Sequence, residues 1–328
     1  MQYSPAPMHI PDGFLSGLVS LVLWAISALA VGYALRRLGR DLSERQVPLM
    51  GVLAAAIFAG QMLNFTVAGG TSGHLMGAAI ATILLGPWAA MLVLTCVVGI
   101  QALIFQDGGL LALGANVFNM AVVGVAVSYM AYRTVQKLAA LAGLAGGRRW
   151  GVYAGGFIAA WLSILASALS VGLQLALSGT SPANLAILAM AGIHALIGVG
   201  EGLITMGALA LVFSARPDLL KNGEAQQAGA AVWVFGLLIA LGLAVASPLA
   251  SSNPDGLVWV AQQQGFLDRA QGPWLDILPG YALPGIPNGT LATIAAAILG
   301  TLLVFGTSLL VAMNRRKQAV REFHDYHE

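Results

Sequence analysis

The stretch Met8-His9-Ile10-Pro11-Asp12-Gly13 lies just ahead of the first long apolar run of the chain, residues 15–35. It contains one histidine, one acid and a Pro-Asp-Gly turn. A second polar stretch, Gly69-Gly70-Thr71-Ser72-Gly73-His74, interrupts the apolar runs further along. We interpret the chain as a membrane protein built around these two stretches.

The first stretch could bind a metal ion if Met8 were the first residue of the mature chain. The Met8 amine, the His9 amide nitrogen and the His9 imidazole would then close a five-membered and a six-membered chelate ring, leaving one corner of a square open. Four nitrogens in a plane suit Ni(II) or Cu(II). His74 could supply the fourth nitrogen. Met8, His9 and His74 are therefore candidate metal ligands.

The seven residues before Met8 would block that amine. They are polar and contain proline, with no charged segment followed by an apolar one, so they do not form a secretory signal peptide. We expect residues 1–7 to be a non-native or processed extension, or translation to begin at Met8.

Composition places the chain among polytopic membrane proteins. Of its 328 residues, 58% are hydrophobic and only 9% are charged, whereas a soluble domain carries about a quarter charged residues. The single cysteine, Cys96, lies in an apolar run. This excludes an internal disulfide and a thiolate metal cluster.

We predict an all-α membrane bundle of about nine transmembrane helices, with the N-terminus outside and the C-terminus inside. The third segment is short for a span, since about 20 residues are usual. This orientation assigns 14 of the 15 Lys and Arg residues to inner loops and only Arg269 to an outer one, as the positive-inside rule requires. The apolar segments are residues 15–35, 47–66, 74–86, 88–106, 112–134, 151–177, 184–213, 228–247 and 290–312.

The spans group into two parts. Residues 8–225 form a metal-binding membrane domain of about seven helices, and residues 226–328 form a separate two-helix accessory module. The module contains a long outer loop, residues 248–289, rich in Pro and Gly. We expect Asp255 to cap a helix within this loop.

His74 follows three glycines in five residues, which permit close backbone approach. We expect it to open a helix, where the positive end of the helix dipole is a poor place for a cation. A metal ligand and a re-entrant turn that contacts water both remain open for this histidine. His324 and His327 resemble ligands too, but they belong to a solvated tail.

His194 and Glu201 stand seven residues apart, on nearly the same face of one helix. An acid inside a span normally has a functional partner. For Glu201, direct ligation, a contact that reports site occupancy to a partner protein and a structural hydrogen bond are all open, and we favour the second. The residues expected to support the ligands or to take part in coupling are Asp12, Ser72, Gln106, Asn116, Asn119, His194 and Glu201. For the amides, simple interhelical hydrogen bonding is an equal alternative.

Several functions compete with metal capture. The string Gly70-Thr71-Ser72-Gly73 matches the G-x-S-G of rhomboid-type intramembrane serine proteases, with His194 as a candidate base. A self-sufficient cation carrier is a third interpretation, which the lack of repeated intramembrane charges disfavours. The sequence has no GxxxxGK[ST] phosphate loop, so we expect no ATP hydrolysis by that route. We expect the chain to be no enzyme, with no organic cofactor and no nucleic-acid partner.

The motifs together resemble the CbiM/NikM family, the substrate-binding membrane subunits of nickel and cobalt energy-coupling-factor transporters. The strings that carry the resemblance are Met8-His9-Ile10-Pro11-Asp12-Gly13-Phe14, Asn64-Phe65, Gly69-Gly70-Thr71-Ser72-Gly73-His74-Leu75, Phe105-Gln106-Asp107-Gly108-Gly109, Gly114-Ala115-Asn116, Phe118-Asn119-Met120, His194-Ala195-Leu196-Ile197-Gly198 and Glu201-Gly202. The region after residue 225 resembles the NikN/PDGLE-like module of the family, with Val258 in place of the final Glu.

This resemblance implies Ni(II) or Co(II) as the transported substrate. It implies Met8, His9 and His74 as ligands, and residues 1–7 depart from the family pattern. It also implies a transmembrane coupling subunit and two ATPase subunits as partners in the cell's inner membrane.

Overall fold

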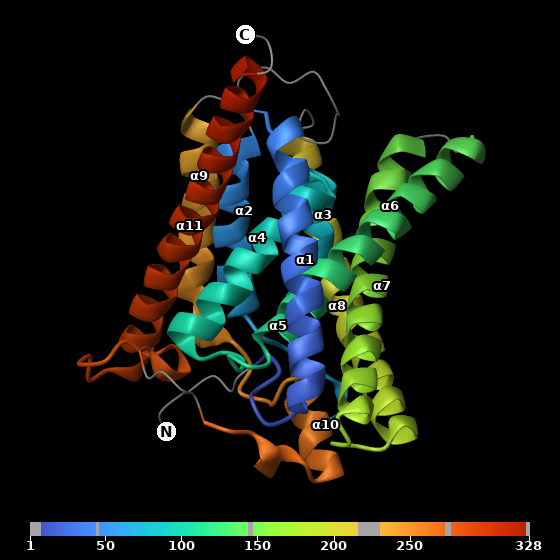
Figure 1. Ribbon diagram of the computed structural model, residues 1–328, viewed down its shortest axis with the longest axis vertical. Helices are drawn as coiled ribbons and strands as arrows, with labels where there is room; N and C mark the ends of the chain where they lie inside the picture. The colour runs from blue at the N-terminus through green and yellow to red at the C-terminus, as the bar shows by residue number, and fades with distance from the viewer. Residues whose placement is uncertain (1–7, 44–45, 144–146, 216–229, 273–276, 326–328) are drawn as a thin grey trace.

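The computed structural model describes residues 8–43, 46–143, 147–215, 230–272 and 277–325. Long helices dominate this part of the chain, with a single two-stranded hairpin. The elements are α1 (Gly17–Asp41), α2 (Gln46–Gln61), β1 (Phe65–Val67), β2 (Thr71–Gly73), α3 (Ala78–Leu85), α4 (Pro87–Ile100), α5 (Leu113–Val117), α6 (Gly124–Leu141), α7 (Gly147–Leu177), α8 (Ala183–Ala215), α9 (Ala230–Ala246), α10 (Gly256–Gln264) and α11 (Gly289–Asp325). The helical bundle expected from the sequence is confirmed (Figure 1).

Six of the described helical segments are long and apolar enough to cross a membrane, and two shorter apolar helices accompany them. The long segments are Gly17–Leu38, Pro87–Phe105, Leu113–Leu141, Arg149–Leu177, Ala183–Ser214 and Gly289–Ala319. Their outward faces carry exposed leucines, such as Leu18, Leu29 and Leu188, as a surface in contact with lipid would. The chain is therefore a multi-pass membrane protein.

The third apolar segment does not form a span. Its helix, α3, has only 8 residues, a length of about 12 Å at 1.5 Å per residue, against a hydrocarbon core of about 30 Å. It begins at Ala78, because His74 and the three residues after it form an irregular segment. The prediction that His74 opens a helix is wrong, because the histidine lies four residues ahead of α3.

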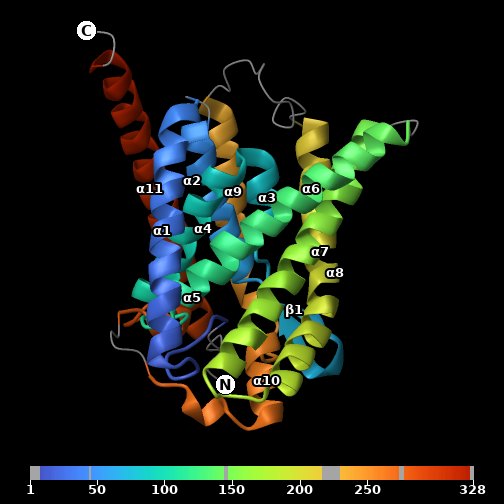
Figure 2. The same cartoon turned by 45° about the vertical axis from the view of Figure 1, so that its right-hand side comes forward.

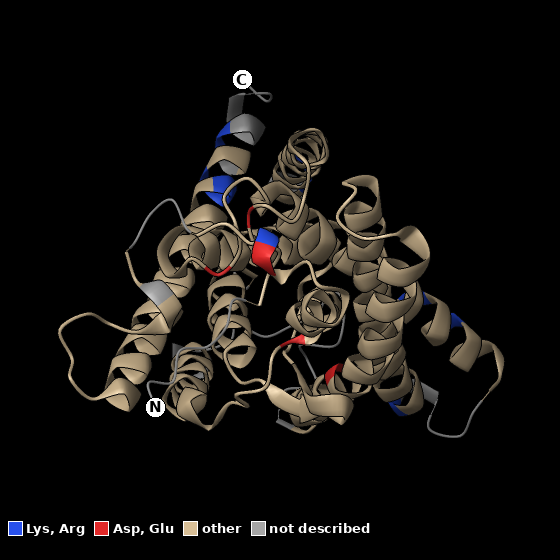
Figure 3. Cartoon of the chain, turned by 90° about the horizontal axis from the view of Figure 1, so that it is seen from below, with Lys and Arg blue, Asp and Glu red and all other residues tan. Residues whose placement is uncertain are grey.

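The basic helix ends gather at one end of the bundle. The end of α1, the α6–α7 pair and the end of α11 lie at the top of Figure 1. These ends include Arg36, Arg37, Arg133, Lys137, Arg149 and Arg315. Seen from the opposite end, the blue positions lie mostly at the periphery and the red acidic ones nearer the middle (Figure 3). This distribution accords with the predicted orientation, which stays a prediction.

Two π-helical turns distort the helices beside the bundle's centre. One, Gln101–Phe105, ends α4, and the other, Phe118–Val123, joins α5 to α6. Such turns occur frequently at functional sites, because the extra residue re-aims the side chains that follow. Here they bring Asp107 and Asn119 to the interior, where both are buried.

The second region of the chain packs directly on the first. Helices α9 and α11 lie against α2, and both run beside it in Figure 1. The outer loop crosses the lower end of the bundle and contains α10 (Figure 2). Asp255 caps α10 by accepting a 2.7 Å hydrogen bond from the Val258 amide, as predicted.

Candidate metal centre

The N-terminal loop is threaded into the bundle and fixed there by backbone hydrogen bonds. The Ile10 amide donates to Asn116 Oδ1 at 3.0 Å, and Asn116 Nδ2 donates back to the Ile10 carbonyl at 3.1 Å. Asp12 accepts hydrogen bonds from the amides of Leu110 and Ala112. The Ile10 carbonyl also accepts a 2.9 Å hydrogen bond from the Gly109 amide, so the loop is held by a side chain and by the backbone.

Three nitrogens of this loop converge on one oxygen of Asp107. Its Oδ1 lies 2.6 Å from Met8 N, 3.2 Å from His9 N and 3.0 Å from His9 Nδ1. The contact to Nδ1 lacks the alignment of a hydrogen bond, and His9 Nε2 has no hydrogen-bond partner among the described residues. The nitrogens predicted to form a chelate are therefore already grouped around a single point.

Gln106 sets the direction of Asp107. Its backbone adopts a left-handed conformation, with φ of 59°, which is uncommon for a residue other than glycine. The turn lets the Asp107 amide donate to the Gln101 carbonyl at 3.0 Å. The role of Gln106 seen in the structure is thus to turn the chain inward just before the carboxylate.

His74 lies next to the His9 ring. Its ring centroid lies 5.7 Å from that of His9, and the two ring planes are inclined at 60°. His74 Nδ1 lies 3.1 Å from the Leu75 carbonyl. Because a carbonyl only accepts, this nitrogen carries the proton and Nε2 keeps a lone pair.

Glu201 holds the segment that carries His74. Its two carboxylate oxygens accept hydrogen bonds from the amides of Met76 and Gly77 at 2.8 and 2.9 Å. Gly77 has a φ of 79°, so the chain turns sharply there before α3 begins. Glu201 is fully buried on α8. Glu201 therefore fixes the position of the irregular segment, residues 74–77, through hydrogen bonds to its backbone.

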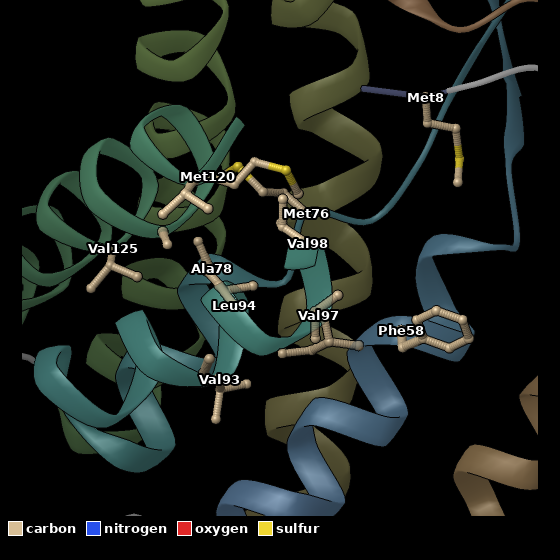
Figure 4. Close-up of a cluster of buried hydrophobic side chains, with 14 of the residues drawn as sticks. Met8, Phe58, Met76, Ala78, Val93, Leu94, Val97, Val98, Met120 and Val125 are labelled. Atoms are coloured by element: carbon tan, nitrogen blue, oxygen red, sulfur yellow. The ribbon is translucent and has the colours of Figure 1, made fainter. Parts of the chain in front are cut away.

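Met8, His9 and His74 line a cavity of about 90 Å³. Figure 4 shows Met76 and Met120 next to each other in the surrounding apolar cluster, with Met8 in the same view. Within the described residues, no three His, Cys, Asp or Glu side chains are grouped so as to hold a metal ion. The cavity wall consists of Met8, His9, Ile10, His74, Met76, Asn116, Asn119, Met120, Ile164, Ser167, Ala168, Val171, Met190, His194, Asp255 and Leu257. A metal held here would need backbone nitrogens as well as side chains.

Two other predicted residues line this cavity. His194 places Nδ1 2.8 Å from the Met190 carbonyl, so its Nε2 also keeps a lone pair. Asn119 exchanges hydrogen bonds with Gln174 at 2.9 and 2.7 Å. This pairing places the carboxamide in a polar contact between α7 and the π-helical turn, as the structural alternative for these amides expected.

Ser72 contacts the outer loop instead of His194. Its amide donates to the Pro254 carbonyl and its hydroxyl to the Asn253 carbonyl, both at 2.8 Å. Because the hydroxyl proton is already used by a backbone acceptor, the pair expected of a serine protease is not formed. Ser72 of β2 also forms an isolated β-bridge with Asp255, the residue just before α10. This bridge joins the hairpin β1–β2, which lies beside α8 in Figure 2, to the outer loop.

The outer loop contributes residues that sequence reasoning did not assign to the site. Asp255 and Leu257 line the cavity. The Tyr281 hydroxyl donates to Asp107 Oδ2 at 2.7 Å, and its ring stacks on Phe105 with centroids 4.8 Å apart. The Pro-Asp-Gly string at 254–256 was the available signal for Asp255. The sequence around Tyr281 gave none.

Burial and charge set the protonation of these groups. Burial, followed by the neighbouring His9, lowers the pKa of His74 to about 4, so this ring is neutral near pH 7. Burial alone would lower the pKa of His9, but the Asp107 carboxylate outweighs it and raises the pKa above its usual value. Burial would raise the pKa of Asp107, yet His9 and the surrounding donors lower it to about 2. The metal-free loop is therefore held by a charged pair.

Fold and site together define a class, namely a helical membrane protein with a cavity lined by three histidines among mostly apolar side chains. A family model described as "Cobalt uptake substrate-specific transmembrane region" (CbiM) matches residues 9–219, and a model of the PDGLE domain matches residues 230–317. The chain belongs to the CbiM family and carries a PDGLE domain after it.

Named relatives share both parts. The chain is 37% identical over 302 residues to a putative fused nickel transport protein NikMN of Archaeoglobus fulgidus, covering 90% of this chain and 95% of the relative. It is 32% identical to the fused nickel transport protein NikMN of Rhodobacter capsulatus, covering 94% and 99%. A crystal structure of a truncated transition metal transporter aligns with a TM-score of 0.54 at 34% identity, covering 63% of this chain and 99% of that one.

Proposed function

We propose that this chain is the substrate-capture subunit of an ATP-driven importer of Ni(II) or Co(II) of the energy-coupling-factor type. It would work with a transmembrane coupling subunit and two ATPase subunits in the cell's inner membrane. The observation that supports the proposal most strongly is the grouping of Met8 N, His9 N and His9 Nδ1 within 3.2 Å of one point, with His74 beside them.

The proposed ligands are the Met8 amine, the His9 amide and imidazole nitrogens, and His74 Nε2. The set requires Met8 to be the mature first residue; residues 1–7 lie outside the described part of the chain. Metal binding then releases the extra proton of the Met8 ammonium group, the amide proton of His9 and the proton on His9 Nδ1, because only unprotonated nitrogens bind metals. The low pKa of His74 leaves that ring ready to bind near neutral pH.

The nature of the donors favours nickel as the first metal to test. Nitrogens in a plane suit Ni(II), and two relatives that share both parts of this chain are named nickel transport proteins. The family description names cobalt, so Co(II) remains a substrate of the proposed importer.

Transport of radioactive nickel by cells that express the chain with its partner subunits tests the proposal. We expect uptake that stops when the ATPase subunits are inactivated. Uptake by this chain without any partner would instead identify a self-sufficient carrier. Labelling of Ser72 by a serine-reactive probe would favour the protease.

A further inference from the structure

We propose that a groove between the start of α2 and the end of α11 binds the phosphate group of an anionic phospholipid. The groove has a volume of about 410 Å³ and is lined by Val47 of α2 and by Met313, Arg316, Lys317 and Arg321 of α11. This volume falls within the range of about 300–1,000 Å³ that is typical of ligand sites. The described residues that line it differ from those of the candidate metal centre, so the inference does not depend on the proposed function.

Helix periodicity gathers the positive charges of the groove. Arg316, Lys317 and Arg321 follow Met313 at three, four and eight residues, within the continuous helix α11. Side chains with this spacing lie on one face of a helix. Among the described residues that line the groove, three are basic and none is acidic. The groove is therefore a place where an anion is attracted by several charges at once.

The groove lies at the depth of the lipid headgroups. The span that contains it, Gly289–Ala319, has 31 residues and a length of about 46 Å at 1.5 Å per residue. A bilayer with its headgroup regions is about 40–45 Å thick, so the last turn of this span lies among the headgroups. The other basic helix ends lie at the same end of the bundle (Figure 1). In the predicted orientation this end faces the inner leaflet, whose anionic lipids attract basic segments.

An apolar track leads from the groove into the membrane, and it favours a lipid over a free phosphate ion. Leu303, Leu310 and Met313 precede Lys317 by 14, seven and four residues, so they lie on nearly the same face of α11. Their side chains are 36%, 58% and 39% exposed. A phospholipid with its phosphate in the groove can lay an acyl chain along these residues. A phosphate ion would leave the track uncovered.

Other basic residues at this end pack on aromatic rings of their own helices. The guanidinium of Arg37 lies 5.3 Å from the ring centroid of Tyr33, and that of Arg133 lies 6.0 Å from the ring centroid of Tyr129. Each arginine stands four residues after its aromatic partner, on the same helix face. These cations are not among the residues that line the groove. They therefore supply controls with the same charge at the same end of the bundle.

Binding of phosphatidylglycerol to the metal-free full chain in detergent, measured by native mass spectrometry, tests the site. The groove variant combines Arg316→Gln, Lys317→Gln and Arg321→Gln. Each cation near an anionic lipid contributes about fivefold in affinity, so we expect the first phosphatidylglycerol to bind on the order of 100-fold more weakly to this variant. Phosphatidylcholine with the same acyl chains, which has no net charge, should bind equally to the wild type and the variant.

A second triple variant serves as the matched control, because it removes three positive charges at the same end of the bundle. It should bind phosphatidylglycerol as the wild type does. Circular dichroism checks that both triple variants keep their helix content. The control combines Arg133→Gln, Lys137→Gln and Arg149→Gln.

Four results would overturn the inference. Unchanged binding in the groove variant, or equal weakening in both triple variants, would remove the groove as a specific site. Displacement of phosphatidylglycerol by an equal concentration of inorganic phosphate would exclude a lipid as the preferred ligand. Loss of assembly with a coupling subunit at unchanged lipid binding would make the groove a protein contact. If the groove variant fails to fold, Lys317→Gln should bind about fivefold more weakly and Lys137→Gln as the wild type; equal binding by these two would overturn the site.

Discussion

Tyr281 and Asp107 are joined by a hydrogen bond of 2.7 Å, although 174 residues separate them. The tyrosine belongs to the region matched by the PDGLE-domain model and the aspartate to the region matched by the CbiM model. With Asp255 in the cavity wall, this contact makes the outer loop a part of the candidate metal centre. The second region therefore builds one wall of the site as well as adding the long helices α9 and α11.

A side chain added at the start of α10 should displace the wall of the cavity that the outer loop forms. A Cβ added at Gly256 would lie 2.7 Å from His194 Cε1 and 2.8 Å from Ile197 Cδ1. We expect Gly256→Ala to cost about 1–3 kcal/mol of stability, as overpacking does, and to speed nickel release because the outer wall is displaced. Gly272→Ala, in the same loop with no atom within 4 Å of the added Cβ, is the control. Equal dissociation rates in both variants would show that α10 does not close the site.

Removing the fourth nitrogen should abolish tight binding. His74→Ala deletes one of the four proposed nitrogen ligands, and loss of a residue that merely supports a ligand already costs about 10–100-fold in affinity. We expect a loss of at least about 100-fold by calorimetry, with the helix content unchanged. His324→Ala, near the far end of α11, should bind as the wild type does. Near-normal affinity in His74→Ala would remove His74 from the ligands.

Glu201 should act on binding through the segment it holds. Glu201→Gln keeps one acceptor oxygen but turns an NH2 group toward the Met76 or Gly77 amide, where two donors would face each other. We expect nickel affinity to fall about 10-fold or more, as for other residues that orient ligands. Asp268→Asn controls for the change of charge. Unchanged binding combined with lost transport would instead assign Glu201 to coupling.

The pKa values of the two histidines of the site should be shifted in opposite directions in the metal-free protein. His74, with its pKa near 4, should stay neutral through the physiological range, whereas His9 should hold its proton above pH 6.5. Protons and metal compete for the same nitrogens, so acidification should weaken binding first through His9. Proton-dependent NMR shifts of labelled histidine, assigned with His74→Gln, measure both values. A His74 signal that titrates near pH 6.5 would contradict the burial argument.

Sequence reasoning identified the parts of the site that are local in the chain. The Met8–Gly13 stretch and His74 stood out because polar residues next to apolar membrane segments indicate a specific contact or function. Asp255 was predicted to cap a helix from the residues next to it in the sequence. The helical membrane class followed from composition. The short third segment was visible as an anomaly, but its irregular start at His74 was not, because four residues without helical structure leave no periodic signal.

The remainder depends on contacts between distant segments. Asp107 stood out only within the string Phe105–Gly109 that carries the family resemblance, and its contacts with Met8 and Tyr281 require the π-helical turn that ends α4 and a folded outer loop. Glu201 was recognised as a buried acid in need of a partner. That its partners are the Met76 and Gly77 amides follows from the packing of α3 against α8, which no pattern within either segment encodes.

The most direct test of the account is the nickel affinity of the chain beginning at Met8, measured with its N-terminal amine free and with that amine acetylated. The account predicts tight binding with a free amine and loss of that binding on acetylation, because an acetylated nitrogen can no longer act as an amine ligand. The chain that retains residues 1–7 should behave like the acetylated form. Equal, tight nickel binding by all three proteins would contradict the chelate and, with it, the central claim.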